Sequence, residues 1–316
     1  MSAASEPARR PPLRLGVFGA GALGYHHVRL AAASPEVELV GVHDPDPAAA
    51  RRAADDHRAR TFDRAEALAG EIEAAVVAVP TVAHAEVAGP LLSRGVHVLV
   101  EKPMASSLAE ADALLAAAAA SGAVLGVGHV EFYNPAVAAL VAAGGAPRFA
   151  EVERLARFTP RSLDVDVVLD LMIHDLQILH ALDPSPLVEV RATGIDVLSP
   201  RVDIANARLA FESGGVANVT ASRVSAERVR KLRVFLPHRY YSLDYQAQEI
   251  KGFRLEEGEA RRIVPDDLPV TPAEPLAREH QAFFARCRGE AVPFVDGAAG
   301  RQALATALEI AAAIGR

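Results

Sequence analysis

The hydrophobic pattern of this 316-residue chain changes character near residue 130. Before that point, short apolar runs alternate with alanine-rich segments of helical spacing. Near-continuous apolar strands separated by helices are typical of a parallel sheet covered on both faces. The expected strands are 13–19, 37–44, 74–80, 96–101 and 123–129, and the expected helices follow Gly24 and occupy 47–57, 84–95 and 108–122.

Beyond residue 130 the strands are longer and alternate between apolar and polar residues. Ala205, Ala207, Leu209 and Phe211 alternate with mostly more polar neighbours, and a tight turn is expected at 213–215. This pattern predicts a largely antiparallel sheet, interrupted by a helix at about 164–182 and followed by a helix at 301–315. The expected strands are 148–158, 187–197, a hairpin over 205–224, and 231–245. We therefore expect an α/β fold with two domains, 13–130 and 131–316, after a flexible lead-in at 1–12.

Composition and charge exclude several classes of function. The net charge is −7, so the chain lacks the basic surface expected of a protein that binds nucleic acid or an anionic membrane. A single cysteine, Cys287, excludes an intramolecular disulfide and argues against a cysteine-based zinc site, and we expect no metal. The N-terminal segment has no apolar stretch of a secretory signal, and the longest uncharged run, 113–128, is too short for a bilayer. We expect a soluble, cytoplasmic protein.

A glycine-rich turn follows the first expected strand and opens the first helix. In such a turn the first glycine allows the tight bend, the second lets a pyrophosphate approach, and the third lets helix pack on strand. An acid, Asp44, ends the next strand, where it could bind the adenosine ribose and repel a 2′-phosphate. Without that context the glycines would be only a small-residue turn. The pattern predicts an N-terminal Rossmann domain that binds NAD; Arg51 and Arg52 leave NADP as the weaker alternative. The expected contacts here are Gly19, Gly21, Ala22, Leu23, Gly24 and Asp44.

Two more segments of interest lie where expected strands of the parallel sheet end, at 74–80 and 96–101. Because ligands bind beyond the carboxyl ends of such strands, we expect the cofactor to meet Pro80, Thr81 and His84 in one segment and Glu101 and Lys102 in the other. Lys102 could share in proton transfer there. The alternative is that Lys102 is an ordinary surface lysine that follows a strand and has no catalytic role.

Asp170 and His174 are four residues apart in an expected helix with an apolar surround. On a helix this spacing places both side chains on one face. A carboxylate one turn before a histidine can orient the imidazole and stabilise its charged form, as a general base requires. The alternative interpretation is a structural hydrogen bond.

Six motifs, in this order, resemble those of the Gfo/Idh/MocA oxidoreductases. They are GAGALG (19–24), Asp44, VPTVAH (79–84), VEKP (100–103), GHVEFYNP (128–135) and LDLMIHD (169–175). The resemblance runs from about residue 13 to the C-terminus. It implies a Rossmann domain, a C-terminal α/β domain whose open sheet often mediates oligomerisation, and oxidation or reduction of sugar or inositol carbinols with NAD or NADP. The second half is most similar to the UDP-N-acetylglucosamine 3-dehydrogenases associated with lipid A made from a 3-amino sugar.

The resemblance also implies roles for single residues. It matches Lys102, Asp170 and His174 to the catalytic set, with Asp170 orienting His174 and either Lys102 or His174 acting as the base. One departure from the subgroup is Phe132, which stands where an arginine is common. Expected substrate contacts are His129, Asn134, Arg157, Arg161 and His174, with the two arginines facing a diphosphate. The alternatives are a dehydrogenase of free inositols or sugars, and a non-catalytic dinucleotide sensor. A homodimer or homotetramer is expected by analogy.

Overall fold

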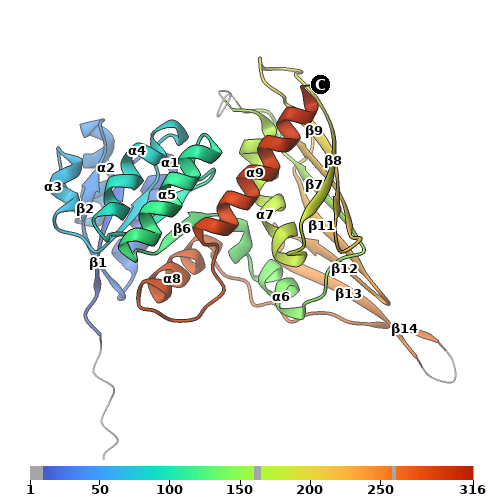
Figure 1. Ribbon diagram of the computed structural model, residues 1–316. Helices are drawn as coiled ribbons and strands as arrows, with labels where there is room; N and C mark the ends of the chain where they lie inside the picture. Colours follow the sequence, from blue (N-terminus) through green and yellow to red (C-terminus); the bar gives the residue numbers. More distant parts are fainter. Residues whose placement is uncertain (1–9, 160–164, 258–260, 316) are drawn as a thin grey trace, which may run out of the picture. The chain divides into compact units, whose positions relative to one another are not determined.

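The computed structural model describes residues 10–159, 165–257 and 261–315 and divides the chain into two compact units (Figure 1). The units are interleaved along the sequence, and the chain passes from the first to the second between Glu101 and Lys102. The first unit comprises the described residues up to Glu101, with Ala113–Gly126 and His280–Phe294; the second comprises Lys102–Asp112, Val127–Glu279 and the described residues from Val295 onward.

A six-stranded sheet with strand order β3-β2-β1-β4-β5-β6 belongs to the first part of the chain. The pairs of β1 with β2 and β4, and of β4 with β5, are parallel. The order reverses at β1, which is the topology of a Rossmann fold. Its strands are β1 (Leu13–Phe18), β2 (Val37–His43), β3 (Arg60–Thr61), β4 (Ala74–Val77), β5 (His97–Glu101) and β6 (Leu125–Gly128). The helices that connect them are α1 (Ala22–Ala33), α2 (Pro47–His57), α3 (Ala65–Ala69), η1 (Thr81–Ala83), α4 (His84–Ser93) and α5 (Leu108–Ser121).

Buried strands hold this sheet in place. All four residues of β4 are fully buried, as are Leu15 and Val17 of β1. Phe283 and Phe284 of α8 (Pro275–Cys287) add their rings to the same core. The parallel sheet and Rossmann fold predicted from the apolar runs are therefore confirmed. The sequence pattern missed the two-residue strand β3, and it missed α3 and α8, whose patterns are short or strongly polar.

The second unit contains an eight-stranded sheet with strand order β14-β13-β12-β11-β7-β10-β9-β8. Its neighbouring strands pair antiparallel except β7 and β10, which pair parallel. The strands are β7 (Phe149–Leu155), β8 (Leu187–Ile195), β9 (Ile204–Phe211), β10 (Val216–Ser222), β11 (Val229–Leu236), β12 (Arg239–Asp244), β13 (Glu249–Glu256) and β14 (Arg262–Pro265). The predicted largely antiparallel sheet is confirmed, although β13 and β14 were not anticipated.

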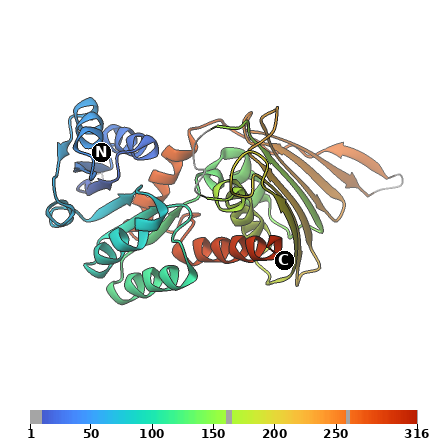
Figure 2. The same ribbon diagram turned by 90° about the horizontal axis from the view of Figure 1, so that it is seen from above.

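Helices cover one face of this sheet, as Figures 1 and 2 show for α9 (Gly297–Ile314) beside β8. Also on this side lie η2 (Val130–Tyr133), α6 (Pro135–Ala143), the π-helical turn η3 (Val168–Met172) and α7 (Ile173–Leu182). The residues of β9 that alternate in the sequence, Ala205, Ala207, Leu209 and Phe211, all point into this core. The helix expected at 164–182 is thus divided into η3 and α7, and α6 was not predicted.

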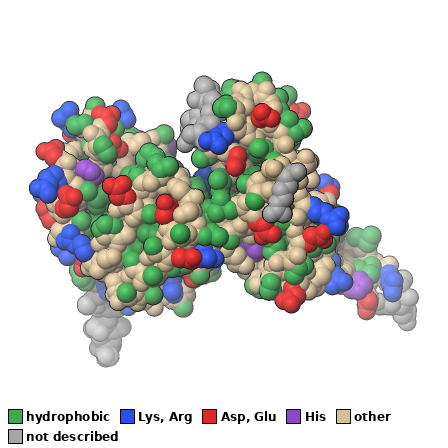
Figure 3. Space-filling model, turned by 45° about the horizontal axis from the view of Figure 1, so that its top comes forward, with side chains coloured by type: hydrophobic (Ala, Val, Ile, Leu, Met, Phe, Trp, Pro, Cys, Tyr) green, Lys and Arg blue, Asp and Glu red, His purple; other side chains and the backbone are tan. Residues whose placement is uncertain are grey.

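The opposite face of the larger sheet carries exposed side chains, including Val188, Ile195, Phe253 and Ile263. On the surface visible in Figure 3, acidic and basic side chains are interspersed. Within the described part of the chain, no helix is both long and apolar enough to span a membrane.

Candidate functional site

The glycine-rich turn between β1 and α1 has the geometry that a pyrophosphate site needs. Gly19 adopts a φ of 92°, and a Cβ on Gly24 would collide with the backbone oxygen of Gly19. At Gly21, by contrast, a Cβ would meet nothing within 4 Å. Gly21, Ala22 and Leu23 are exposed, and Gly21, the N-cap residue of α1, has no side chain that could cap the helix. The helix N-terminus therefore presents backbone N–H groups to an anion, which fits a dinucleotide.

Asp44 stands at the end of β2 beside this turn. One carboxylate oxygen accepts a 2.6 Å hydrogen bond from the backbone N–H of Ala20, and the other accepts a 2.8 Å bond from that of Asp46. The same residue lines a cavity of about 280 Å³ together with Arg51 and Thr61. Asp44 therefore braces the glycine turn and retains acceptor capacity for a ribose hydroxyl.

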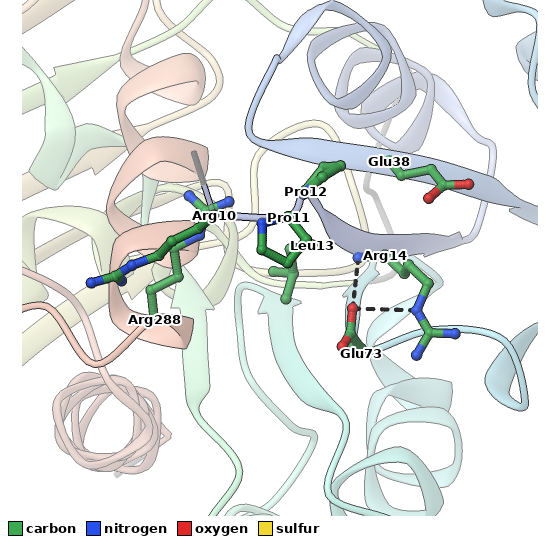
Figure 4. Close-up of a pocket in the computed structure, with 8 residues that line it drawn as sticks. All are labelled: Arg10, Pro11, Pro12, Leu13, Arg14, Glu38, Glu73 and Arg288. Carbon is green, nitrogen blue, oxygen red and sulfur yellow. Dashed lines mark hydrogen bonds and ion pairs between the residues drawn. The ribbon is translucent and has the colours of Figure 1, made fainter. Parts of the chain in front are cut away.

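A larger cavity of about 530 Å³ lies at the opposite end of the strands of this sheet (Figure 4). Leu13, the first residue of β1, lines it, and Arg14 and Glu73 form an ion pair at its wall. It therefore lies at the amino ends of the strands. Ligands of open α/β sheets bind at the carboxyl ends, where the glycine turn and the Asp44 cavity lie, and not at the end that this larger cavity occupies.

Two predicted cofactor contacts have structural partners inside the first unit. The Nε2 atom of His84 lies 2.9 Å from the backbone oxygen of Val79, and His84 is buried at the start of α4. Glu101 is also buried, 2.9 Å from Nε2 of His27, whose Nδ1 lies 2.7 Å from His280. Pro80 is exposed and Thr81 half-buried where β4 ends. The geometry leaves Pro80 and Thr81 accessible and gives Glu101 and His84 buried supporting positions.

Lys102 meets Asp170 in the second unit. Its Nζ donates a 2.7 Å hydrogen bond to the backbone carbonyl of Asp170 and lies 3.4 Å from the carboxylate. Both side chains are largely buried, and the peptide bond between Lys102 and Pro103 is cis. The predicted hydrogen bond from Asp170 to His174 is not among the contacts of the described residues. The nearby ammonium group takes the carboxylate instead, because a cation attracts it more strongly than a neutral imidazole does.

Two histidines form the rest of this cluster. The rings of His129 and His174 meet edge to face, with centroids 5.7 Å apart. Within the described part of the chain, neither ring nitrogen of the buried His129 has a hydrogen-bond partner, nor does Nδ1 of His174. Burial lowers the pKa of His129 to about 3, and Lys102 adds to the shift. Burial, followed by Lys102 and Arg154, also holds the pKa of His174 well below its usual value. Both imidazoles are therefore neutral near pH 7, next to a cationic lysine.

A buried ion network supports both histidines, and sequence reasoning missed it. Arg154 of β7 binds Asp175 through two hydrogen bonds of 2.6 and 2.8 Å and Glu131 through one of 2.8 Å. Asp175 directly follows His174, and Glu131 lies two residues after His129. Tyr245 donates to Asp175, and burial raises its pKa well above normal. The only signal for it in the sequence was Arg154 itself, a charged residue at an inward-facing position of a strand whose residues alternate between apolar and polar.

Three further predicted substrate contacts have different outcomes. The side chain of Asn134 caps α6 through the N–H of Ala136 and donates to the backbone oxygen of Tyr245, so its geometry indicates a structural role. Arg157 is exposed and lines a cavity that also contains Asp170. Arg161 lies outside the described residues.

Comparisons with known proteins agree with this geometry. Residues 13–129 match the model of an oxidoreductase family with an NAD-binding Rossmann fold, Gfo/Idh/MocA. The chain is 39% identical over 306 residues to UDP-N-acetylglucosamine 3-dehydrogenase from Acidithiobacillus ferrooxidans, covering 96% of this chain and 97% of the relative. This chain belongs to the Gfo/Idh/MocA family. The resemblance drawn from the motifs is thereby confirmed, as is the expectation of an NAD-binding oxidoreductase.

Solved structures extend the comparison. The structure of the Acidithiobacillus ferrooxidans enzyme matches with a TM-score of 0.91 at 38% identity, over 96% of this chain and 98% of that one. An inositol dehydrogenase homologue from Azotobacter vinelandii, complexed with NAD⁺, matches with a TM-score of 0.84 at 20% identity, over 96% of both chains. At 20% identity, the second match shows that the two proteins share a fold and no more than that. Myo-inositol dehydrogenase Hyg17 from Streptomyces leeuwenhoekii is 32% identical over 60% of this chain and 62% of its own length.

Proposed function

We propose that this protein oxidises the C3 hydroxyl of UDP-N-acetylglucosamine with NAD as the hydride acceptor. The observation that carries the proposal is the cluster of Lys102, His129 and His174, in which one cation lies beside two neutral imidazoles. The substrate is inferred from the relative named UDP-N-acetylglucosamine 3-dehydrogenase, which is similar over nearly the whole chain.

The two domains have separate tasks in this proposal. Residues 13–130 bind the dinucleotide, with its pyrophosphate at Gly21 and Ala22 and its ribose at Asp44. Residues 131–316 bind the substrate and form the oligomer. When bound, NAD supplies a nicotinamide ring that accepts a hydride. The open face of the larger sheet, with exposed Val188 and Phe253, supports assembly into a homodimer or homotetramer.

Two residues of the second structural unit, Lys102 and His174, act on the same hydroxyl oxygen. The carbinol C–H bond breaks and its electron pair leaves as hydride, while the O–H proton passes to His174 and a ketone forms. His174 suits this step because it is neutral before the reaction and can accept the proton. Lys102 donates a hydrogen bond to the oxygen as negative charge develops there, and Asp170 positions Lys102. His129 offers unpartnered ring nitrogens to a further polar group of the substrate.

A second candidate is oxidation of a free inositol or sugar, which the similarity to the myo-inositol dehydrogenase favours. Nothing in the Lys102 and His174 geometry requires a nucleotide on the substrate. A non-catalytic sensor would need the Rossmann domain but not the cluster around Lys102.

The test measures NADH formation by the purified protein with NAD and either UDP-N-acetylglucosamine or a panel of free inositols and hexoses. An aminotransferase with its amino donor removes the ketone. Turnover confined to the nucleotide sugar supports the proposal, whereas turnover on a free polyol alone contradicts the substrate assignment. NADH binding without turnover on any compound would favour the sensor.

A further inference from the structure

A cavity of about 450 Å³ in the second unit borders the proposed catalytic cluster. Asp170, which holds Lys102, forms part of its wall, and the remaining polar wall is dominated by Arg157, Arg223, Arg228 and Arg230. A substrate that places its hydroxyl near Lys102 would therefore have arginines beside its remaining part. Such a wall suits an anion, since guanidinium groups bind phosphate oxygens in pairs.

Two of these arginines are already committed to carboxylates. Arg223 is buried, 3.0 Å from the carboxylate of Asp203, and it donates to the backbone oxygens of Val165 and Val202. Arg230 donates a 3.0 Å hydrogen bond to Glu131. Arg223 therefore shapes the wall, and its charge is balanced within the fold.

Arg230 shares its partner with another arginine. The oxygen of Glu131 that Arg230 contacts also accepts a hydrogen bond from Arg154. Burial lowers the pKa of Arg230, and repulsion from Arg154 and Arg228 acts in the same direction. A second anion beside Arg230 would relieve this repulsion.

The other two arginines bring charge that no carboxylate of the described residues pairs with. Arg157 donates to the backbone oxygen of Ala226, which carries no net charge, and Arg228 is exposed. In the described part of the chain, neither has a carboxylate partner within ion-pair distance. As far as the described residues go, the cavity therefore offers two guanidinium groups without a carboxylate partner, which matches the two negative charges of a diphosphate diester.

We propose that this cavity is the diphosphate subsite, in which Arg228 and Arg157 bind the two phosphates and Arg230 completes the cationic wall. The inference rests on the proposed function and deepens it. It assigns specificity for a nucleotide sugar over a free sugar to strand β11, the loop before it and the segment that follows β7. The subgroup arginine that Phe132 replaces is then not needed, because the cationic groups come from another part of the domain.

The test is calorimetric titration of UDP into the protein saturated with NADH, which fills the other diphosphate site. Arg228→Ala is compared with Arg228→Lys and with Arg201→Ala, a matched exposed arginine of the same unit outside the cavity. We expect Arg228→Ala to weaken UDP binding about tenfold or more, Arg228→Lys to weaken it less, and Arg201→Ala to leave it unchanged.

Steady-state kinetics add a second readout. For UDP-N-acetylglucosamine, Arg228→Ala should raise KM about tenfold with little change in kcat, because the lost contact is equal in ground and transition states. Equal UDP affinity in the wild type and Arg228→Ala, or no UDP binding by the wild type, would overturn the subsite. If UDP binds through Arg228 but the nucleotide sugar is not oxidised, the subsite stands and the reaction assignment fails.

Discussion

The ammonium group of Lys102 donates a 2.7 Å hydrogen bond to the backbone carbonyl oxygen of Asp170, while the carboxylate of the same residue lies 3.4 Å away. The shorter of these two contacts is therefore to a backbone atom, which no substitution at position 170 removes. Asp170→Asn should lower kcat by about tenfold, because only the weaker carboxylate contact is lost. Lys102→Met should lower it by about a hundredfold or more, since no donor remains for the developing oxyanion.

Steady-state kcat of the two variants checks this ranking, with NADH affinity as the control for correct folding. If Asp170→Asn were as inactive as Lys102→Met, the carboxylate itself would have to act in the chemistry.

The pH dependence of His174 tests whether it is the base. Burial, and after it the charge of Lys102, lowers the pKa of His174 well below 6.5, the usual value for histidine. The imidazole is therefore neutral at pH 6.5 and becomes protonated only at lower pH. The value of kcat/KM for alcohol oxidation should therefore show no loss from this group at pH 6.5 and should fall when the pH drops well below it. His174→Asn should reduce turnover by roughly a hundredfold while leaving NADH affinity nearly intact.

A second observable separates this from a structural role. Lys102→Met removes a nearby positive charge, so the pKa of His174 should rise, and its imidazole NMR signals should titrate at higher pH than in the wild type. An unchanged titration midpoint would show that Lys102 does not act on His174.

Two glycines of the first unit give a matched pair of alanine variants. At Gly21 a Cβ meets nothing within 4 Å and the backbone φ is −63°, so Gly21→Ala should fold normally. Its methyl group would nevertheless occupy the approach of the pyrophosphate, and NADH affinity should fall about tenfold or more. Gly24→Ala should instead destabilise the fold, because its Cβ collides with the backbone of Gly19.

Fluorescence titration with NADH and thermal unfolding measure the two effects separately. The assignment of the glycine turn to the cofactor would fail if Gly21→Ala bound NADH as tightly as the wild type.

The first unit could be predicted further from sequence than the proposed catalytic site. Most strands and helices and the glycine turn follow from local pattern, because apolar runs and glycine spacing carry their own physical constraints. The site in the second unit depends on contacts between distant residues, such as Arg154 with Asp175, which no local spacing encodes. For the same reason, the Asp170 and His174 spacing suggested a hydrogen bond, whereas the carboxylate lies beside Lys102, far away in sequence.

Arg154 should be essential to the fold even though it does not belong to the proposed catalytic set. Burial alone would lower its pKa, but Asp175 raises it well above normal, so the group stays charged inside the protein. Arg154→Met would leave Asp175 and Glu131 buried without this cation, and the expected cost is about 3–5 kcal/mol in the free energy of unfolding. The matched control is Arg233→Met on the neighbouring strand, whose pair with Glu151 is partly exposed and should contribute about 1 kcal/mol or less. Urea unfolding measures the loss of free energy of unfolding in both variants. Equal losses would mean that the buried network stabilises the protein no more than a surface ion pair does. A clearly larger loss in Arg154→Met would show that Arg154 holds the segments bearing His129 and His174 on the sheet.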